Sequence, residues 1–410
     1  MLAEFKPGQA YQHLERAQHL ERQGRLDEAM MEFKRAVEAD PSIAAARNAL
    51  GQHYLRKGLL TKAVDEFHSA ALLSGDYESC FNLGRVLVEL ERYAEAKDAF
   101  GRCLTLDPGD PSSRYELAYV QFAAGQFGEA LAQFLSLVEQ YPEDWELKFA
   151  IADCQMGLED YAAAEQTLRG ALHDAPSTAD LTVMREAWLR TRRYLEFPTS
   201  PGNNLKNRLY ADHGIILLGT GHDDGLDIPI YKEHTFTYRD VGVTLCRLWR
   251  TIQAGSWHLT AVTSVDEDSL PLAIALSHML EVPLLSVEEL RSEDFVLLVL
   301  ARGDRPELFE VTLEHIPGRM LSFALALTWS ASEGLLSDVV GVRATGTCTL
   351  PWHRLRKRSA EAAATSIFRA LTIVPDDDNA AEQARYYTQD HQLLRCLDPP
   401  RDGREMAAAA

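Results

Sequence analysis

Residues 77–110 read YESCFNLGRVLVELERYAEAKDAFGRCLTLDPGD, and this stretch decides the fold of the first half of the chain. Gly84 lies in the first of two predicted helices, Ala96 opens the second, and Phe100 follows one turn later. The two small residues let the helices approach closely, and Phe100 fills the groove between neighbouring hairpins. Pro108 closes the unit, because proline cannot continue a helix. The stretch therefore predicts a pair of antiparallel helices.

The same pattern recurs along the first half of the chain. Units start near Ala10, Ala44, Tyr77, Pro111 and Trp145, at spacings of 34, 33, 34 and 34 residues. A single hairpin cannot bury its own apolar face, so consecutive hairpins must stack. The small residues of the first helices are Gly51, Gly84, Ala118 and Ala152, those of the second helices are Ala29, Ala63, Ala96, Ala130 and Ala164, and the large residues are Phe33, Phe67, Phe100, Phe134 and Leu168.

These copies resemble the tetratricopeptide repeat (TPR) family. The resemblance implies an α-solenoid whose hairpins bind other proteins, so that the chain is predicted to be an adaptor or scaffold rather than an enzyme. Residues 10–194 are expected to form five TPR hairpins and a capping helix. That helix, residues 179–194, has Arg185, Arg190, Arg192 and Arg193 as its expected polar outer face.

The concave side of such an array is lined by the first helices, and its middle is unusually apolar here. Aromatic residues and Arg are the types that anchor interfaces. An alternative is that some of these aromatics pack between repeats or against the C-terminal half. Some family members grip a terminal carboxylate with Lys, Asn and Arg, but no Lys is predicted in this groove. The predicted partner-binding residues are Asn48, Gln52, Phe81, Arg85, Tyr115, Tyr119, Phe122, Phe149 and Asp153.

Residues 195–204, LEFPTSPGNN, are a predicted linker to a small α/β domain over 205–397. Strands that alternate with helices indicate a mostly parallel sheet. The predicted strands are 214–219, 228–231, 257–263, 282–286, 295–301 and 320–328, and the predicted helices are 240–252, 270–280, 359–371 and 380–396.

Residues 258–286 resemble the strand, loop, helix and strand of a type I phosphoribosyltransferase. In that family the loop binds a pyrophosphate through backbone N–H groups. Here the loop Ser264–Ser269 reads SVDEDS and has three carboxylates, and the strand 295–301 runs into RGDRP instead of paired acids and a phosphate loop. The resemblance therefore implies a related domain without transferase activity. The alternative function is an enzyme or sensor that acts on a phosphorylated small molecule or nucleotide through this domain.

Composition excludes several classes of partner. The formal net charge of −20 repels nucleic-acid phosphates and anionic lipids, so neither is an expected partner. The six cysteines, at 80, 103, 154, 246, 348 and 396, have no metal-ligand spacing and suit a reducing cytoplasm. The apolar runs are too short to span a bilayer, and the first residues do not read as a signal peptide. No catalytic residue, metal or cofactor is predicted.

Two local motifs allow two interpretations each. Residues 219–227, GTGHDDGLD, are typical of a turn, although His222, Asp223, Asp224 and Asp227 could together hold a divalent cation. Residues 353–358, HRLRKR, are either a solvated loop or helix start, or a site for an acidic partner or for the acidic array itself.

Overall fold

The structure, a computed structural model, describes residues 7–174, 177–223, 228–303, 305–328, 337–353, 359–372 and 378–397. It divides into two compact units, Met1–Ser177 and Thr178–Ala410. Each unit has an apolar core of its own. The fold class predicted from the sequence, an α-solenoid followed by an α/β domain with a mostly parallel sheet, is confirmed.

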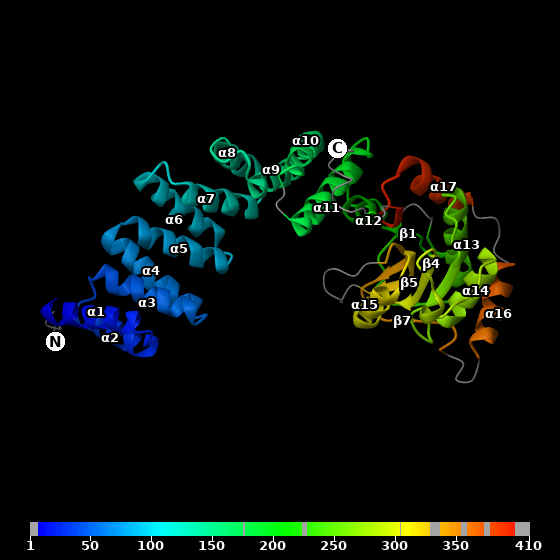
Figure 1. The fold of residues 1–410 in the computed structure, drawn as a ribbon, viewed down its shortest axis with the longest axis horizontal. Coiled ribbons are helices and arrows are strands. Elements are labelled where there is room, and N and C mark those ends of the chain that lie inside the picture. Colours follow the sequence, from blue (N-terminus) through cyan, green and yellow to red (C-terminus); the bar gives the residue numbers. More distant parts are fainter. Residues whose placement is uncertain are drawn as a thin grey trace. The chain divides into compact units, whose positions relative to one another are not determined.

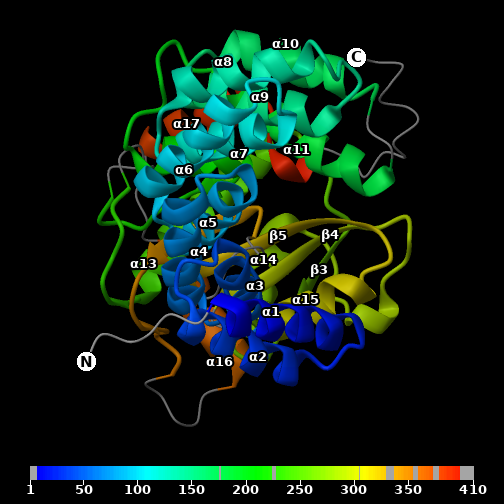
Figure 2. The ribbon, with the colours of Figure 1, turned by 90° about the vertical axis from the view of Figure 1, so that its left-hand side faces the viewer.

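Antiparallel helix pairs make up the described part of the first unit, and they follow one another in chain order (Figure 1; Figure 2). The helices with odd numbers are the first helices of the hairpins, and those with even numbers are the second. They are α1 (Pro7–Arg22), α2 (Leu26–Ala39), α3 (Ala44–Arg56), α4 (Leu60–Ser74), α5 (Tyr77–Glu89), α6 (Tyr93–Leu106), α7 (Pro111–Ala123), α8 (Phe127–Val138), α9 (Trp145–Gly157) and α10 (Tyr161–Ala171).

The large residues of the repeat pattern are the centre of this packing. All of them are at most 2% exposed, and the small residues opposite them leave space for their side chains. Carboxylates begin three of the first helices: Asp76, Asp110 and Asp144 each accept a hydrogen bond from a backbone N–H in the first turn of α5, α7 and α9. The repeat therefore specifies both where each helix begins and how closely its partner packs.

The turn inside each hairpin contains one residue in the left-handed region. In three hairpins it is a glycine, Gly24, Gly58 or Gly125, with φ of 75°, 69° and 74°. In the other two the same position is occupied by Glu91 and Glu159, with φ of 57° and 60°. A residue with a Cβ is strained in this region, so Glu91 and Glu159 destabilise these two turns relative to glycine.

The second unit is a parallel sheet with helices on both faces. Its helices are α11 (Thr178–Leu195), α12 (Leu205–His213), α13 (Tyr238–Ala254), α14 (Leu270–Leu280), α15 (Pro306–His315), α16 (Ala360–Leu371) and α17 (Asp378–Arg385). Its strands are β1 (Ile216–Leu217), β2 (His234–Thr235), β3 (Ala261–Ser264), β4 (Phe295–Arg302), β5 (Arg319–Thr328), β6 (Val339–Ala344) and β7 (Cys348–Thr349).

Among the described residues the main sheet has the order β1-β6-β5-β4-β3, and every pair in it is parallel. Side chains of β4 alternate between its two faces: Leu297 and Val299 enter a core with α13 and α14, whereas Leu298 and Leu300 pack against Phe309 of α15. This alternation produces three layers, with the sheet in the middle.

The predicted elements of this unit agree with the structure at some positions and differ at others. The helix 270–280 and the strands 295–301 and 320–328 correspond to α14, β4 and β5. The sequence interpretation missed α12, α15 and β6, an interior strand of the sheet. The predicted helix 380–396 is shorter than expected, because α17 ends at Arg385 and a π-helical turn follows over Tyr386–Asp390.

The last described segment returns to the beginning of the second unit. Arg395 N donates to Gly214 O over 3.1 Å, and Leu393 N donates to the hydroxyl of Tyr210 over 2.9 Å. Arg193 of α11 is 2% exposed, and its Nε donates to Leu393 O over 2.9 Å. The expectation that Arg193 belongs to a polar outer face is therefore wrong, because this segment covers it. Whether α11 also caps the repeat array stays a prediction.

Candidate functional site: a pocket on the first helices

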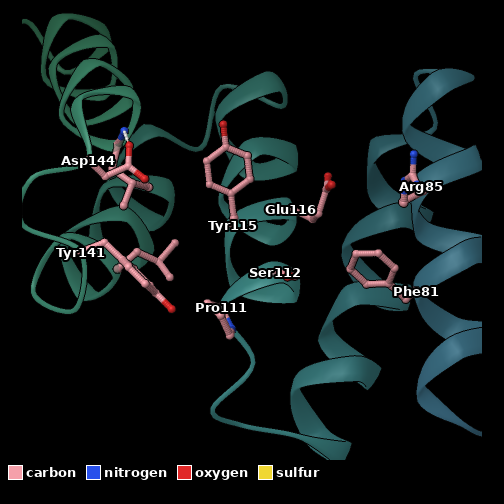
Figure 3. A pocket seen from close by; sticks show the side chains of 10 residues that line it. Phe81, Arg85, Pro111, Ser112, Tyr115, Glu116, Tyr141 and Asp144 are labelled. Atoms are coloured by element: carbon pink, nitrogen blue, oxygen red, sulfur yellow. Dashed lines mark hydrogen bonds between the residues drawn. The ribbon is translucent and has the colours of Figure 1, made fainter. Parts of the chain in front are cut away.

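The first helices of the third, fourth and fifth hairpins line a pocket of about 480 Å³ (Figure 3). Its walls come from α5, α7 and the turn that leads into α9, with Leu137 of α8 and Leu147 of α9. The lining residues are Phe81, Arg85, Pro111, Ser112, Tyr115, Glu116, Leu137, Tyr141, Asp144 and Leu147. The volume is within the range of about 300–1,000 Å³ that is typical of small-ligand sites, so a side chain of a partner can enter.

Local helix chemistry positions these side chains. Phe81 and Arg85 are four residues apart on α5 and therefore share one face of the helix. Asp110 caps α7 and also accepts a hydrogen bond of 2.6 Å from the hydroxyl of Tyr77. Burial, together with this bond, raises the pKa of Tyr77 to about 12, so the hydroxyl remains protonated. The link fixes α7 against α5 at the edge of the pocket.

Aromatic rings form much of the lining and rest on a buried apolar framework. Phe81 stacks on Tyr77 with centroids 5.5 Å apart, and it meets Phe100 edge to face at 5.6 Å. Tyr115 contacts Phe134 edge to face at 5.7 Å and is still 38% exposed. Tyr141 is 46% exposed. The rings are thus held in place and remain accessible, which is a property of residues that anchor interfaces.

Charges of both signs border the pocket. Glu116 and Arg85 form no hydrogen bond or ion pair with any other described residue. Burial raises the pKa of Glu116, and the positive charge of Arg85 opposes that rise. Burial and the carboxylates of Glu146, Glu116 and Asp144 raise the pKa of Tyr115.

The structure brings part of the predicted groove together. Phe81, Arg85 and Tyr115 line the pocket, and Tyr119 lies one turn after Tyr115 with 43% of its surface exposed. Gln52, Phe149 and Asp153 are half-buried. Phe122 is half-buried too and meets Phe127 edge to face inside its own hairpin, at 5.5 Å.

Asn48 has a different environment from the rest of the predicted set. It is 7% exposed, and its Nδ2 donates to Ser79 Oγ of the next first helix over 3.1 Å. Its amide therefore joins two neighbouring repeats.

Sequence reasoning missed several lining residues. Glu116, Tyr141 and Asp144 were not in the predicted set, although Tyr141 and Asp144 each had a signal in the sequence. Tyr141 precedes Pro142 in the turn between hairpins, and Asp144 precedes the first helical residue, Trp145, as an N-cap does. The prediction used positions on the first helices alone, so it omitted the turn that closes the pocket.

In the second unit, charged residues fill the carboxyl ends of β3 and β4. The oxygens of Asp268 accept hydrogen bonds from Arg302 Nη2 at 3.0 Å and from His353 Nε2 at 2.9 Å. Burial opposes ionisation of Asp268, but the His353 hydrogen bond and the charges of His353 and Arg302 outweigh it and lower its pKa. β3 has chain on both edges, because it pairs with β4 on one side and forms a bridge to Leu284 on the other. The carboxyl ends of the strands in a parallel sheet are where ligands usually bind.

The turn interpretation of residues 219–227 agrees with its described part. The Asp223 carboxylate accepts hydrogen bonds from Thr220 N and from the hydroxyl of Tyr231. Asp224 and Asp227 lie outside the described residues, as does 354–358 of the basic run. Among the residues that are described, no group of three or more His, Cys, Asp and Glu side chains is placed to hold a metal ion.

Comparisons with known proteins agree with the geometry of the first unit. The sequence profile of the tetratricopeptide repeat family matches residues 7–77, 81–144 and 115–179. The first unit therefore consists of tetratricopeptide repeats, as the sequence predicts. The matched residues end at 179, and these comparisons do not support the resemblance of residues 258–286 to a phosphoribosyltransferase. No helix within the described ranges is both long and apolar enough to cross a bilayer.

One curated relative is the cytochrome c-type biogenesis protein CycH of Rhizobium meliloti (strain 1021). It is 33% identical over 111 residues, which are 26% of this chain and 29% of that protein, so the chain spans less than a third of that relative. Among solved structures, YrrB, a TPR protein with an unusual peptide-binding site, is 24% identical over 42% of this chain and 90% of its own, with a TM-score of 0.40. MamA is 20% identical over 42% and 94%, with a TM-score of 0.39.

Proposed function

We propose that this protein is an adaptor or scaffold that binds a partner protein or peptide on the first helices of its repeat array. The observation that carries the proposal is the pocket between α5, α7 and α9, where aromatic side chains are both held in place and exposed. Tyr119, one turn after Tyr115 on the same face of α7, extends the exposed aromatic surface beyond the pocket. Exposed aromatics that cost little entropy to immobilise are the usual anchors of such interfaces.

The relative named for cytochrome c-type biogenesis fits this proposal in a limited way. Assembly of another protein requires a module that holds a polypeptide, and an adaptor of this kind meets that need. We propose a role in holding a polypeptide, and the aligned 111 residues support nothing more specific.

The second unit has less support as an enzyme that acts on a phosphorylated ligand. A phosphate at the ends of β3 and β4 would have to displace or neutralise Asp268, which already pairs with Arg302 and His353. The negative charges of a phosphate and of Asp268 would repel each other unless a cation or a proton lay between them. We therefore expect that neither a nucleotide nor phosphoribosyl pyrophosphate raises the melting temperature of the full chain.

The adaptor proposal is tested by comparing matched variants of the full chain. Proteins captured from an extract are quantified for the wild type, for Tyr115→Ala/Tyr119→Ala and for Leu72→Ala. Leu72 is an exposed apolar residue of the second helix α4, with 68% of its surface exposed. A specific partner should be lost from the tyrosine variant and retained by the leucine variant, and purified partner should then bind directly in calorimetry. Equal retention by all three proteins would contradict the proposal.

A further inference from the structure

The pocket contains a carboxylate, Glu116, that forms no hydrogen bond or ion pair with the residues that the structure describes. Glu116 projects from α7 toward Phe81 and Arg85 of α5 (Figure 3). It is half-buried and forms no hydrogen bond or ion pair with the described part of the chain. Burial still raises the pKa of Glu116 in spite of the positive charge of Arg85, so a second cation placed beside the carboxylate would stabilise it further.

A second carboxylate faces the same space from the opposite wall. Asp144 uses Oδ1 to accept a hydrogen bond of 3.1 Å from Leu147 N as the cap of α9, and Oδ2 has no such role. Glu146, an exposed residue in the first turn of that helix, is outside the lining but is among the carboxylates that raise the pKa of Tyr115. Arg85 is the only basic residue among those that line the pocket.

The aromatic lining also favours a positively charged ligand. The face of an aromatic ring attracts cations, and the attraction grows when solvent is partly excluded. Phe81, Tyr115 and Tyr141 supply three such rings within one pocket. Leu137 and Leu147, at 2% and 3% exposure, form an apolar floor that suits the aliphatic stem of a long side chain.

We propose that this pocket receives a lysine or arginine side chain of a partner polypeptide, with an apolar residue beside it. The inference rests on the proposed function and specifies the chemistry of the partner. The cationic group lies between the carboxylates of Glu116 and Asp144 and the aromatic faces, while the methylene stem contacts the apolar floor. An acidic partner segment would have to approach two carboxylates in order to reach the single Arg85.

Selection of peptides on the full chain tests this chemistry without a known partner. A displayed library of short random peptides is selected on the wild type and, for subtraction, on Tyr115→Ala/Tyr119→Ala. The enriched peptides should contain Lys or Arg next to an apolar residue. Synthetic labelled copies are then measured by fluorescence anisotropy, together with copies in which the basic residue is replaced by norleucine.

Matched variants of the protein separate charge from shape. Glu116→Gln and Asp144→Asn keep the size of each side chain, and Asn is also a good helix cap. Each should weaken the basic peptide about 5–10-fold and lower the salt dependence of binding. Arg85→Gln should leave the affinity unchanged or increase it, because it removes a competing cation. Glu38→Gln, the same change at an exposed site on α2, should have no effect.

The outcomes distinguish the two proposals. Enrichment of acidic or uncharged peptides, or loss of binding in Arg85→Gln, would contradict the inference that the pocket receives a basic side chain. Either result would leave the proposed adaptor role in place. An equal affinity of the lysine and norleucine peptides also overturns that inference, and this comparison needs no protein variant. If no peptide is enriched over the tyrosine variant, both the proposed function and this inference fail.

Discussion

A Cβ atom built on Gly84 would lie 2.7 Å from Cε1 and Cζ of Phe100. The Phe100 ring is fully buried and meets Phe81 edge to face, so it has little freedom to withdraw. The same relationship holds between Gly51 and Phe67, where the distance is 2.8 Å. Contact between one glycine and one ring therefore limits how closely the two helices of each of these hairpins approach, and the pocket depends on this contact through Phe81.

Gly84→Ala should destabilise the third hairpin. Overpacking a filled core costs about 1–3 kcal/mol, and alanine returns up to about 1 kcal/mol through its helix propensity. A net loss of roughly 1–2 kcal/mol is expected in the opening free energy of the α5 and α6 amides, measured by hydrogen exchange on the full chain. Gly101→Ala is the control, because a Cβ there meets nothing within 4 Å and should stabilise α6 by about 0.5–1 kcal/mol. Equal stability of the two variants would show that Phe100 moves freely.

Glu91→Gly should stabilise its turn even though it introduces a glycine. Glu91 is exposed and has a φ of 57°, a region that costs a residue with a Cβ about 1–2 kcal/mol. Glycine loses more backbone entropy on folding, which costs about 0.5–1 kcal/mol, so a net stabilisation of up to about 1 kcal/mol is expected. Glu15→Gly, in the exposed middle of α1, should instead lose about 1 kcal/mol. Hydrogen exchange checks both variants, and a loss at both sites would contradict the strain argument.

Glu116→Gln should raise the melting temperature of the array at neutral pH. Burial raises the pKa of Glu116 in the folded state, so the folded chain holds its proton to a higher pH than the unfolded chain. Stability from this group therefore falls as the pH rises through the folded pKa, and the effect disappears below the unfolded value of about 4.3. The difference between variant and wild type should shrink as the pH is lowered to 4. A difference that is the same at every pH would argue against a carboxylate destabilised by burial.

Arg193→Met should weaken the second unit. The substitution keeps much of the stem but leaves the carbonyl of Leu393 without this donor, at a cost of about 1–3 kcal/mol. Amides of residues 391–397 should exchange faster than in the wild type. Arg192→Met, one residue earlier, removes an exposed guanidinium that lies over Trp188 at 4.9 Å and should change stability by less than about 1 kcal/mol. Similar effects of the two variants would mean that Arg193 does not anchor this segment.

The repeat array could be predicted because its physics is local and recurs. Gly51, Gly84 and their equivalents are each matched by a large residue about 16 positions later in the same hairpin, and Gly84 packs against Phe100 in this way. The burial of Asn48 could not be predicted in this way. Its partner, Ser79, belongs to the next repeat, and a pattern for one repeat does not describe that contact.

The second unit was harder to predict because its strands are specified by distant neighbours. The interior strand β6 reads VVGVRA and contains Gly341, which lowers strand propensity. A Cβ at Gly341 would lie 2.5 Å from Leu325 O and 2.9 Å from Thr244 Cγ2, so glycine permits the close approach of β5 and α13. In the pocket, Tyr141 and Asp144 were missed for a related reason, since they belong to a turn between hairpins and not to a helix face.

The hydrogen bonds from Leu393 and Arg395 to Tyr210 and Gly214 join positions that are more than half of the second unit apart in sequence. During synthesis the repeats leave the ribosome first, and each hairpin can close as soon as its neighbour has emerged. The second unit can complete its fold only after the segment with Leu393 and Arg395 has been translated. A growing chain would thus display the completed pocket of the third to fifth hairpins while the second unit is still unfinished.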